Sequence, residues 1–99
     1  MSIAEGKKDD DGKLRWSIVP FEQIEIVLKV LEFGANKYGI NNWKEVFGAK
    51  PRYINAAMRH LVARMKGHIN DEESGLPHLA HCVCCLLFLL WFDENDKTL

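Results

Sequence analysis

The sequence lacks several features by which secreted, membrane-spanning and nucleic-acid-binding proteins are recognised. Its first residues contain no apolar stretch of the kind that forms a signal peptide. Its three cysteines are an odd number in one apolar run, which makes a poor disulfide framework, so we expect a reducing compartment, the cytoplasm. The 13 Lys and Arg residues nearly balance the 14 Asp and Glu residues, so we expect no nucleic-acid partner.

The sequence also lacks an apolar stretch long enough to cross a membrane. The longest run, from Cys82 to Phe92, has eleven apolar residues, whereas a spanning helix needs about 20. We therefore expect no membrane partner.

A helix that is apolar on every side must be enclosed by protein, and a chain of 99 residues buries only about 60–65% of its unfolded surface. The run therefore predicts a homo-oligomer.

No segment alternates apolar and polar residues between hairpin turns, so a sheet is not expected. Apolar residues at helical spacing instead predict three helices, from Phe21 to about Lys37, from about Arg52 to Gly67, and from about Pro77 to Asp93. The length fits one domain. We expect an all-α bundle of three to four helices over residues 17–99, preceded by an irregular polar arm over residues 1–16.

Three histidines are the sharpest candidates for chemistry. His78 and His81 are three residues apart on the third helix, so they lie on one face. An antiparallel second helix brings His60 alongside them, with Asp71 in the connecting loop. Imidazole and carboxylate together suit a divalent transition metal. Two alternatives stay open, namely hydrogen-bonded core histidines and a zinc site that uses the cysteines four residues after each of the paired histidines.

A second group of candidates is acidic and lies on the first helix. Glu25 and Glu32 are seven residues apart and point the same way, with Glu22 one step round the helix. Such carboxylates could hold Mg²⁺ or Mn²⁺ against a pyrophosphate. Lys29 stands among them at the spacing of a solvated salt-bridge ladder, which is the alternative interpretation.

A third group combines basic and aromatic side chains, which suit phosphates and a nucleotide base. With a net charge near zero, the group indicates one focused pocket, although scattered surface cations are the simpler interpretation. A glycine-rich phosphate loop and a nucleophile elbow are both missing. The members of the group are Lys13, Arg15, Trp16, Lys37, Tyr38, Trp43, Arg52, Tyr53, Arg59 and Arg64.

Three motifs in this order resemble a known family. FGAxKYGxxNW runs from Phe33 to Trp43, RH stands at Arg59 and His60, and SGLPHLAH runs from Ser74 to His81. The region from about residue 11 to 92 resembles the phage dATP/dGTP diphosphohydrolase domain (MazZ-type), which is similar to the all-α MazG-like nucleotide pyrophosphohydrolases. The resemblance implies a small helical bundle, usually a dimer or tetramer, in the cytoplasm of a phage-infected cell.

The resemblance also implies an activity and roles for individual residues. The activity is metal-dependent hydrolysis of a purine deoxynucleoside triphosphate, dGTP or dATP, to the monophosphate and pyrophosphate, assisted by Mn²⁺, Mg²⁺ or Co²⁺. The site would remove purine nucleotides from the pool used for phage genome synthesis. The metal would be held by His60, Asp71, His78 and His81, with His60 and His81 as catalytic groups. Glu25 is outside the matched motifs, and its role as a further catalytic group is a hypothesis from the acidic residues of the first helix. The substrate would be bound by Lys13, Arg15, Lys37, Tyr38, Asn42, Trp43 and Arg59.

The sequence departs from the wider MazG group at one point. Where that group has an ExxD motif on the later helix, this chain has His78-Leu79-Ala80-His81. Two other hypotheses stay open, and the departure motivates the first of them. One is a catalytically inactive protein that sequesters a nucleotide or a cyclic nucleotide, and the other is a purely structural role in which the apolar third helix is an assembly interface.

Overall fold

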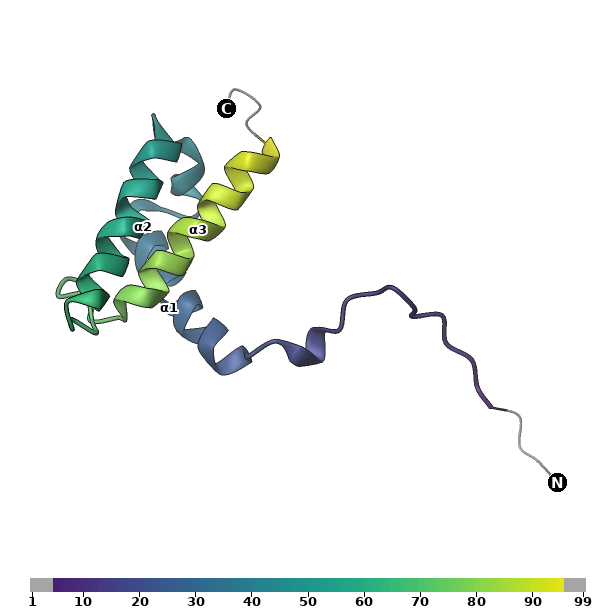
Figure 1. Cartoon of the computed structure of the whole chain (residues 1–99). Helices are drawn as coiled ribbons and strands as arrows, with labels where there is room; N and C mark the ends of the chain where they lie inside the picture. The colour runs from purple at the N-terminus through teal and green to yellow at the C-terminus, as the bar shows by residue number, and fades with distance from the viewer. Residues whose placement is uncertain (1–4, 96–99) are drawn as a thin grey trace.

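The computed structural model describes residues 5–95, which form three α-helices and no β-strand. The helices are α1 (Phe21–Tyr38), α2 (Ala49–Met65) and α3 (His78–Asn95), with 3-10 turns η1 (Trp16–Ile18) and η2 (Asn42–Glu45) (Figure 1). The all-α prediction is confirmed. Residues 1–4 of the predicted arm and 96–99 of the predicted domain lie outside the described residues. Within 5–95, no helix has both the length and the apolarity to cross a membrane.

The helix boundaries follow the sequence except at the start of α2. The sequence predicts a start near Arg52, after a linking segment that ends at Pro51, but α2 begins at Ala49. Pro51 is the third residue of the helix, where the backbone N–H has no partner within the helix in any case. Gly48 precedes the helix with a φ of 62° and gives the chain the left-handed turn it needs there.

The core lies along α3, which contacts both other helices. On the side of α1, Val27 and Val30 form a buried cluster with Ala80 and Cys84. On the side of α2, the buried cluster contains the small residues Ala57, Cys82 and Cys85. Because these side chains are short, the helix backbones can approach closely, and α3 is held between α1 and α2.

Most of the large apolar side chains on α2 and α3 are not part of this core. The sequence predicts that α3 must be enclosed by protein and that a chain this small does not cover it alone, and within one chain α3 is indeed left partly uncovered. Five of its large side chains are 38–60% exposed. They are Leu79, Val83, Leu86, Leu87 and Leu90. The two other helices are too few to surround a third helix that is apolar all round.

The residues before α1 extend away from the helices (Figure 1). Residues 5–15 contain no helix, and all the side chains of residues 5–18 are exposed. The radius of gyration is 18.6 Å, against about 13 Å for a compact domain of about 100 residues. We refer to residues 5–18 as the arm.

The close packing of α2 on α3 can be tested at Ala57. We expect Ala57→Leu to destabilise the fold by about 1–3 kcal/mol, because the added atoms push the two helices apart. The control is Met58→Leu at the adjacent exposed position, which should change stability by less than about 0.5 kcal/mol. Urea unfolding followed by circular dichroism measures both values, and equal stabilities would contradict the described packing.

Candidate functional site

The site begins with the loop between α2 and α3. Backbone hydrogen bonds close this loop, from His78 N–H to the Ile69 carbonyl and from Asp71 N–H to the Leu76 carbonyl, both with N···O distances of 2.8 Å. Gly75 has a φ of +71°, which a residue with a side chain rarely adopts. The loop therefore holds Asp71 at a fixed position beside the first turn of α3.

Asp71, Ser74 and His81 form one hydrogen-bonded chain. Asp71 Oδ1 accepts the Ser74 backbone N–H at 2.9 Å and lies 3.2 Å from the Ser74 hydroxyl oxygen. The same hydroxyl oxygen is 2.6 Å from His81 Nε2 and accepts the Leu76 N–H. An ionised carboxylate only accepts and a hydroxyl has one hydrogen, so one arrangement satisfies every group. His81 Nε2 donates to Ser74, which donates to Asp71, and His81 Nδ1 keeps its lone pair.

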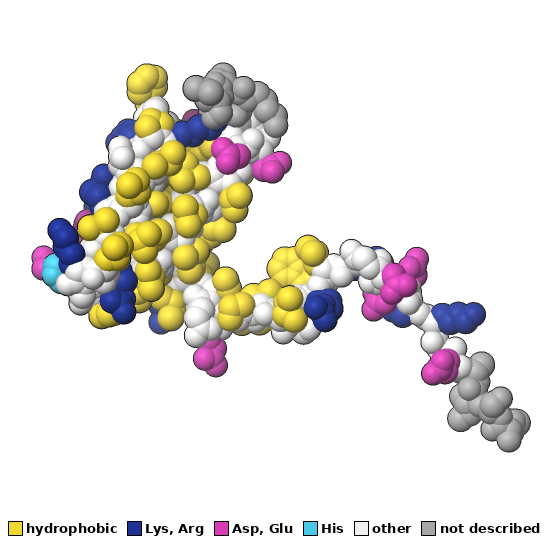
Figure 2. Space-filling view, viewed as in Figure 1, with side chains coloured by type: hydrophobic (Ala, Val, Ile, Leu, Met, Phe, Trp, Pro, Cys, Tyr) yellow, Lys and Arg dark blue, Asp and Glu magenta, His cyan; other side chains and the backbone are white. Residues whose placement is uncertain are grey.

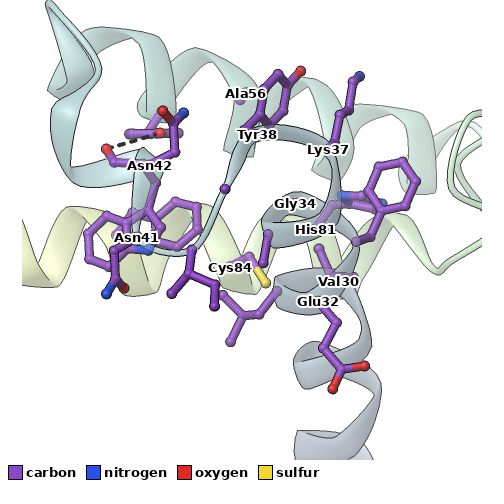
Figure 3. Close-up of a pocket in the computed structure, with 18 of the residues that line it drawn as sticks. Val30, Glu32, Gly34, Lys37, Tyr38, Asn41, Asn42, Ala56, His81 and Cys84 are labelled. Atoms are coloured by element: carbon purple, nitrogen blue, oxygen red, sulfur yellow. Dashed lines mark hydrogen bonds between the residues drawn. The ribbon is translucent and has the colours of Figure 1, made fainter.

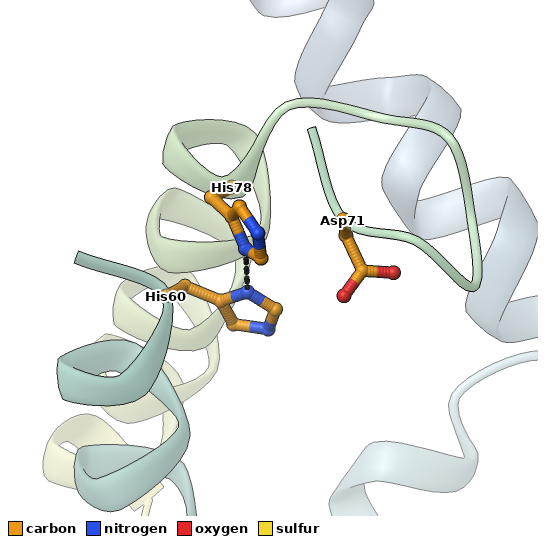
Figure 4. A group of neighbouring side chains, drawn as sticks. All are labelled: His60, Asp71 and His78. Carbon is orange, nitrogen blue, oxygen red and sulfur yellow. Dashed lines mark hydrogen bonds between the residues drawn. The ribbon is translucent and has the colours of Figure 1, made fainter. Parts of the chain in front are cut away.

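His60 and His78 meet across the α2–α3 contact (Figure 4). Their Nδ1 atoms are 2.9 Å apart, so one ring donates the hydrogen and the other accepts it. The His60 ring also stacks on His81, with ring centres 4.6 Å apart and planes 12° apart. The antiparallel arrangement predicted for the three histidines is therefore present, and α2 supplies one ring while α3 supplies two.

Three of these side chains have the geometry of a candidate metal centre. One potential ligand atom each from His60, Asp71 and His78 lies within 4.8 Å of the other two. Two nitrogens bound at about 2.1 Å in neighbouring positions of an octahedral ion are about 3 Å apart, which fits the 2.9 Å between the two imidazoles. His81, the fourth predicted ligand, is instead hydrogen-bonded to Ser74.

Burial and nearby groups shift the pKa values of His60, His81 and Asp71. Burial lowers the pKa of His60, and the nearby His81 and His78 lower it further, while burial also lowers the pKa of His81. Burial raises the pKa of Asp71, but the two hydrogen bonds from Ser74 outweigh it, so the pKa is lowered overall. The His60 and His81 imidazoles are therefore neutral and the Asp71 carboxylate is ionised near neutral pH, which are the states in which such groups bind a metal.

A pocket of about 700 Å³ lies beside the histidines (Figure 3). The C-terminal half of α1, the segment through η2, α2, the loop and α3 all contribute to its walls. Seven of the predicted site residues line it, and these are Lys37, Tyr38, Asn42, Trp43, His60, Asp71 and His81. The volume lies in the range of small-molecule sites.

The two aromatic candidates for base stacking differ in their surroundings. Trp43 stacks on Phe88, with ring centres 4.4 Å apart, and meets the edge of Trp91, so one of its faces is already covered. Tyr38 is 63% exposed, and Lys37 Nζ lies 5.0 Å from the centre of its ring. Tyr38 therefore offers the more accessible aromatic face, beside a cation.

We refer to three exposed polar residues that line the pocket, Lys37, Tyr38 and Glu73, as its rim. Lys37 and Glu73 form an ion pair, and the hydrogen bond to Glu73 raises the pKa of Lys37. Glu32 also lines the pocket, but Figure 3 shows its carboxylate pointing away from it. The one lysine of the lining is therefore already paired with a carboxylate.

Four predicted site residues lie away from this pocket within one chain. Glu25 is exposed on the second turn of α1, and Lys13 and Arg15 are on the arm. Arg59 lines a separate shallow groove on α2 with Lys66 and His68. Their assigned roles stay predictions. No ion pair of the predicted Glu22–Glu32 ladder is present within residues 5–95.

Sequence reasoning missed two contacts of the site. Glu73 pairs with Lys37 across 36 residues, and no local spacing signals such a contact. From the sequence, Ser74 is expected only to form a turn before the third helix and to match the family motif, whereas the structure shows that it links Asp71 to His81. The SGLP turn was the available signal, because a serine before such a turn often bonds to nearby backbone groups.

The cysteines four residues after the paired histidines do not join the metal group. Cys82 and Cys85 are buried against α2, and Cys84 donates a weak hydrogen bond to the Val27 carbonyl at 3.5 Å. Burial raises the pKa of the Cys84 thiol to about 12 and that of Cys85 to about 11. Among the described residues, the group with metal-ligand geometry contains no cysteine.

These features define an all-helical protein with a pocket beside a candidate metal centre. The sequence pattern of the family described as dATP/dGTP diphosphohydrolase, N-terminal, matches residues 4–99, so the chain belongs to this family. It is 37% identical over 94 residues to a protein of Salmonella phage PMBT28 named dATP/dGTP diphosphohydrolase. That match covers 94% of this chain and 31% of the relative, so the chain spans about a third of the curated relative's length. No solved structure matches.

The lowered histidine pKa values predict a pH-dependent stability. Because the folded state holds His60 and His81 below their usual pKa of about 6.5, the unfolded state binds more protons. This stability is present above about pH 6.5 and is lost as the pH falls through the folded-state values. We expect the melting temperature, measured by circular dichroism in EDTA, to fall between about pH 7.5 and pH 5.

Two variants test whether the histidine cluster causes the fall in melting temperature at low pH. His60→Asn should reduce it, whereas His68→Asn, at an exposed histidine outside the cluster, should leave it unchanged. An identical fall in the wild type and in His60→Asn would show that the cluster does not cause the pH dependence.

Proposed function

We propose that the pocket binds a purine deoxynucleoside triphosphate, dGTP or dATP, and that the chain hydrolyses it to the monophosphate and pyrophosphate. The observation that carries the proposal is the meeting of His60, Asp71 and His78 within 4.8 Å, beside a pocket whose rim holds Lys37 and Tyr38. Family membership and the name of the phage relative support the same substrate class. In the cytoplasm of an infected cell, this activity would control the purine nucleotide pool.

The proposed cofactor is a divalent cation held by His60, Asp71 and His78. Two imidazoles and one carboxylate favour Mn²⁺ or Co²⁺ over Mg²⁺, which prefers oxygen ligands. The cation would neutralise phosphate charge and lower the pKa of a bound water. Ser74 keeps Asp71 ionised and oriented through its two hydrogen bonds.

The other proposed roles follow from the same contacts. His81 lines the pocket and has Nδ1 unprotonated in the arrangement described above, so it can accept a proton from an attacking water. Tyr38 provides a face for the base, and Asn42 and Trp43 close the same wall. Lys37 would exchange its contact with Glu73 for a phosphate oxygen.

The activity can be tested directly with the eight common ribo- and deoxynucleoside triphosphates and with Mn²⁺, Co²⁺ or Mg²⁺. We expect pyrophosphate release to be fastest with dGTP or dATP. His78→Ala should lower the rate by at least about 100-fold, because it removes a metal ligand, while His68→Ala keeps it. Hydrolysis that is equally fast in His78→Ala, or absent with every substrate and metal, would refute the proposal.

A second candidate function is nucleotide or cyclic-nucleotide sequestration without catalysis. It is favoured by the distance of the predicted catalytic Glu25 from the pocket, since Glu25 is not among the lining residues of one chain. Calorimetry separates the two functions. Tight binding that needs no metal and leaves the nucleotide intact supports sequestration, and binding that needs a metal and ends in pyrophosphate supports the enzyme.

We also propose that the protein is a homo-oligomer, a dimer or tetramer, assembled through α2 and α3. Each helix exposes an apolar stripe with the same spacing, in which the second to fifth members lie 4, 7, 8 and 11 residues after the first. Figure 2 shows apolar side chains spread over both helices. The stripes are Ile54, Met58, Leu61, Val62 and Met65 on α2, and Leu79, Val83, Leu86, Leu87 and Leu90 on α3.

The area of these stripes is large for a surface left in water. The ten side chains are 38–77% exposed, which corresponds to roughly 600 Å² of apolar surface at about 120 Å² for a whole Leu-sized side chain. The largest patch on a monomeric protein is about 300–600 Å², and a standard interface takes about 800 Å² from each partner.

The interface can be tested by the mass of the particle in solution. We expect light scattering after size exclusion to give a multiple of 11.4 kDa for the wild type. Leu86→Glu should give mainly the monomer mass, because it would bury an unpaired charge in the interface. Phe47→Glu, at an exposed apolar residue outside both stripes, is the control. A monomeric wild type would contradict the proposal.

A further inference from the structure

We propose that the arm of one copy docks on a second copy and places Lys13 and Arg15 at the rim of that copy's pocket. The proposed occupant of the rim is therefore a segment of the same protein in another subunit. The inference rests on the proposed function, because it names the groups that would neutralise a bound triphosphate. It is carried by the charge of the pocket, by the shape of the arm, and by the direction in which the arm leaves the helices.

The pocket of one chain has too little positive charge for a triphosphate. Its one lysine, Lys37, is paired with Glu73, and the Asp71 carboxylate is also in the lining. A divalent cation held by the histidines would offset these carboxylates but leave little positive charge for a ligand that carries several negative charges. Further cationic side chains must come from outside the lining of one chain.

The arm carries cations next to apolar side chains that cover nothing in their own chain. Leu14 is 81% exposed, and Trp16 and Ile18 are both 69% exposed. Lys13 and Arg15 alternate with these residues. A segment that combines a tryptophan, two aliphatic side chains and two cations matches the composition of interface anchors, in which aromatic residues and arginine are enriched.

The arm also has a defined local shape. Lys13 N–H bonds to the Asp10 carbonyl at 3.1 Å, closing a turn in which Gly12 has a φ of +78°. After this turn, η1 fixes Trp16–Ile18. A segment whose backbone is already bent into turns loses less conformational freedom on docking than a random coil does.

The arm is poorly placed to reach the rim of its own pocket. It joins α1 at Phe21, whereas Lys37 and Tyr38 are at the opposite end of that helix, about 24–26 Å away along its axis. The eight residues from Phe21 back to Lys13 span at most about 26–29 Å when fully extended. To reach Lys37 in its own chain, the arm would have to reverse at Pro20 and unwind η1, whereas Figure 1 shows it leaving in the opposite direction.

A second copy would cover the exposed apolar side chains of the arm and would add positive charge to the pocket through the same contact. In a symmetric pair, each subunit gives an arm and receives one, so both arms are covered and both pockets gain two cations. The phosphates of a nucleotide would then lie between Lys37 of one subunit and the Lys13 and Arg15 side chains of the other, and the carboxylates of Asp71 and Glu73 would attract the incoming cations even without a nucleotide.

The docking is tested by photocrosslinking in the full-length protein. The photoreactive amino acid p-benzoylphenylalanine replaces Trp16, an exposed position where the fold does not depend on the side chain. Isotopically heavy and light protein are mixed, unfolded, refolded together and irradiated without nucleotide. We expect mass spectrometry to find crosslinks from position 16 to peptides that contain Lys37, Tyr38 or Glu73, with heavy peptides joined to light ones. Crosslinks only within one chain, or none to these peptides, would overturn the inference.

A complementation experiment tests whether the cations act in the second subunit. The double variant Lys13→Ala/Arg15→Ala and the pocket variant His78→Ala should each lose at least about 100-fold of the hydrolysis rate. Refolded together, they should recover about one quarter of the wild-type rate, because half of the pairs are mixed and each has one complete site. The control variant Lys7→Ala/Lys8→Ala, which alters arm cations before the turn, should be fully active. No recovery in the mixture would overturn the inference.

The two experiments separate this inference from the proposed function. Crosslinks between chains in a protein that hydrolyses no nucleotide would refute the proposed enzyme and support the docking of the arm. Hydrolysis with crosslinks confined to single chains would support the enzyme and refute the docking.

Discussion

The close packing of α3 between the other two helices is the constraint on which the rest of the structure depends. Small side chains at the contacts allow the backbones to approach, chiefly Ala80 and Cys84 between α3 and α1, and Ala57 and Cys82 between α2 and α3. The same approach brings the ring of His60 on α2 against the rings at the start of α3. The core and the candidate metal centre are thus two ends of one helix contact.

The first turn of α3 and its remaining turns differ in chemical character and in role. Its first turn carries polar chemistry, with His78 and His81 tied to His60 and to the structured loop. Its remaining turns carry apolar side chains that one chain cannot cover. The exposed apolar side chains of α3 are a property of one chain, and the need for further cations at the pocket is the premise of the proposal for the arm. A second subunit is the common remedy in both proposals.

Much of the fold could be predicted, since helical periodicity and the absence of strand patterns are local properties of the sequence. The extent of α1 followed from the Pro20 and Gly39 boundaries, whereas α2 began earlier than expected because Pro51 is harmless in a first turn. The approach of the three histidines was predictable from an antiparallel helix pair. The pairing of Lys37 with Glu73 was not, because it depends on where α1 crosses the loop.

The sequence by itself determined the helices, the apolar character of α3 and the residue types available for metal and phosphate chemistry, because each depends on neighbours within one or two turns. Only the tertiary structure decided which of those residues meet. It joined His60, Asp71 and His78, tied His81 to Ser74, and set Glu25 and the arm apart from the pocket. These outcomes depend on the directions in which helices cross and loops turn, which are properties of the packed chain and not of any short segment of it.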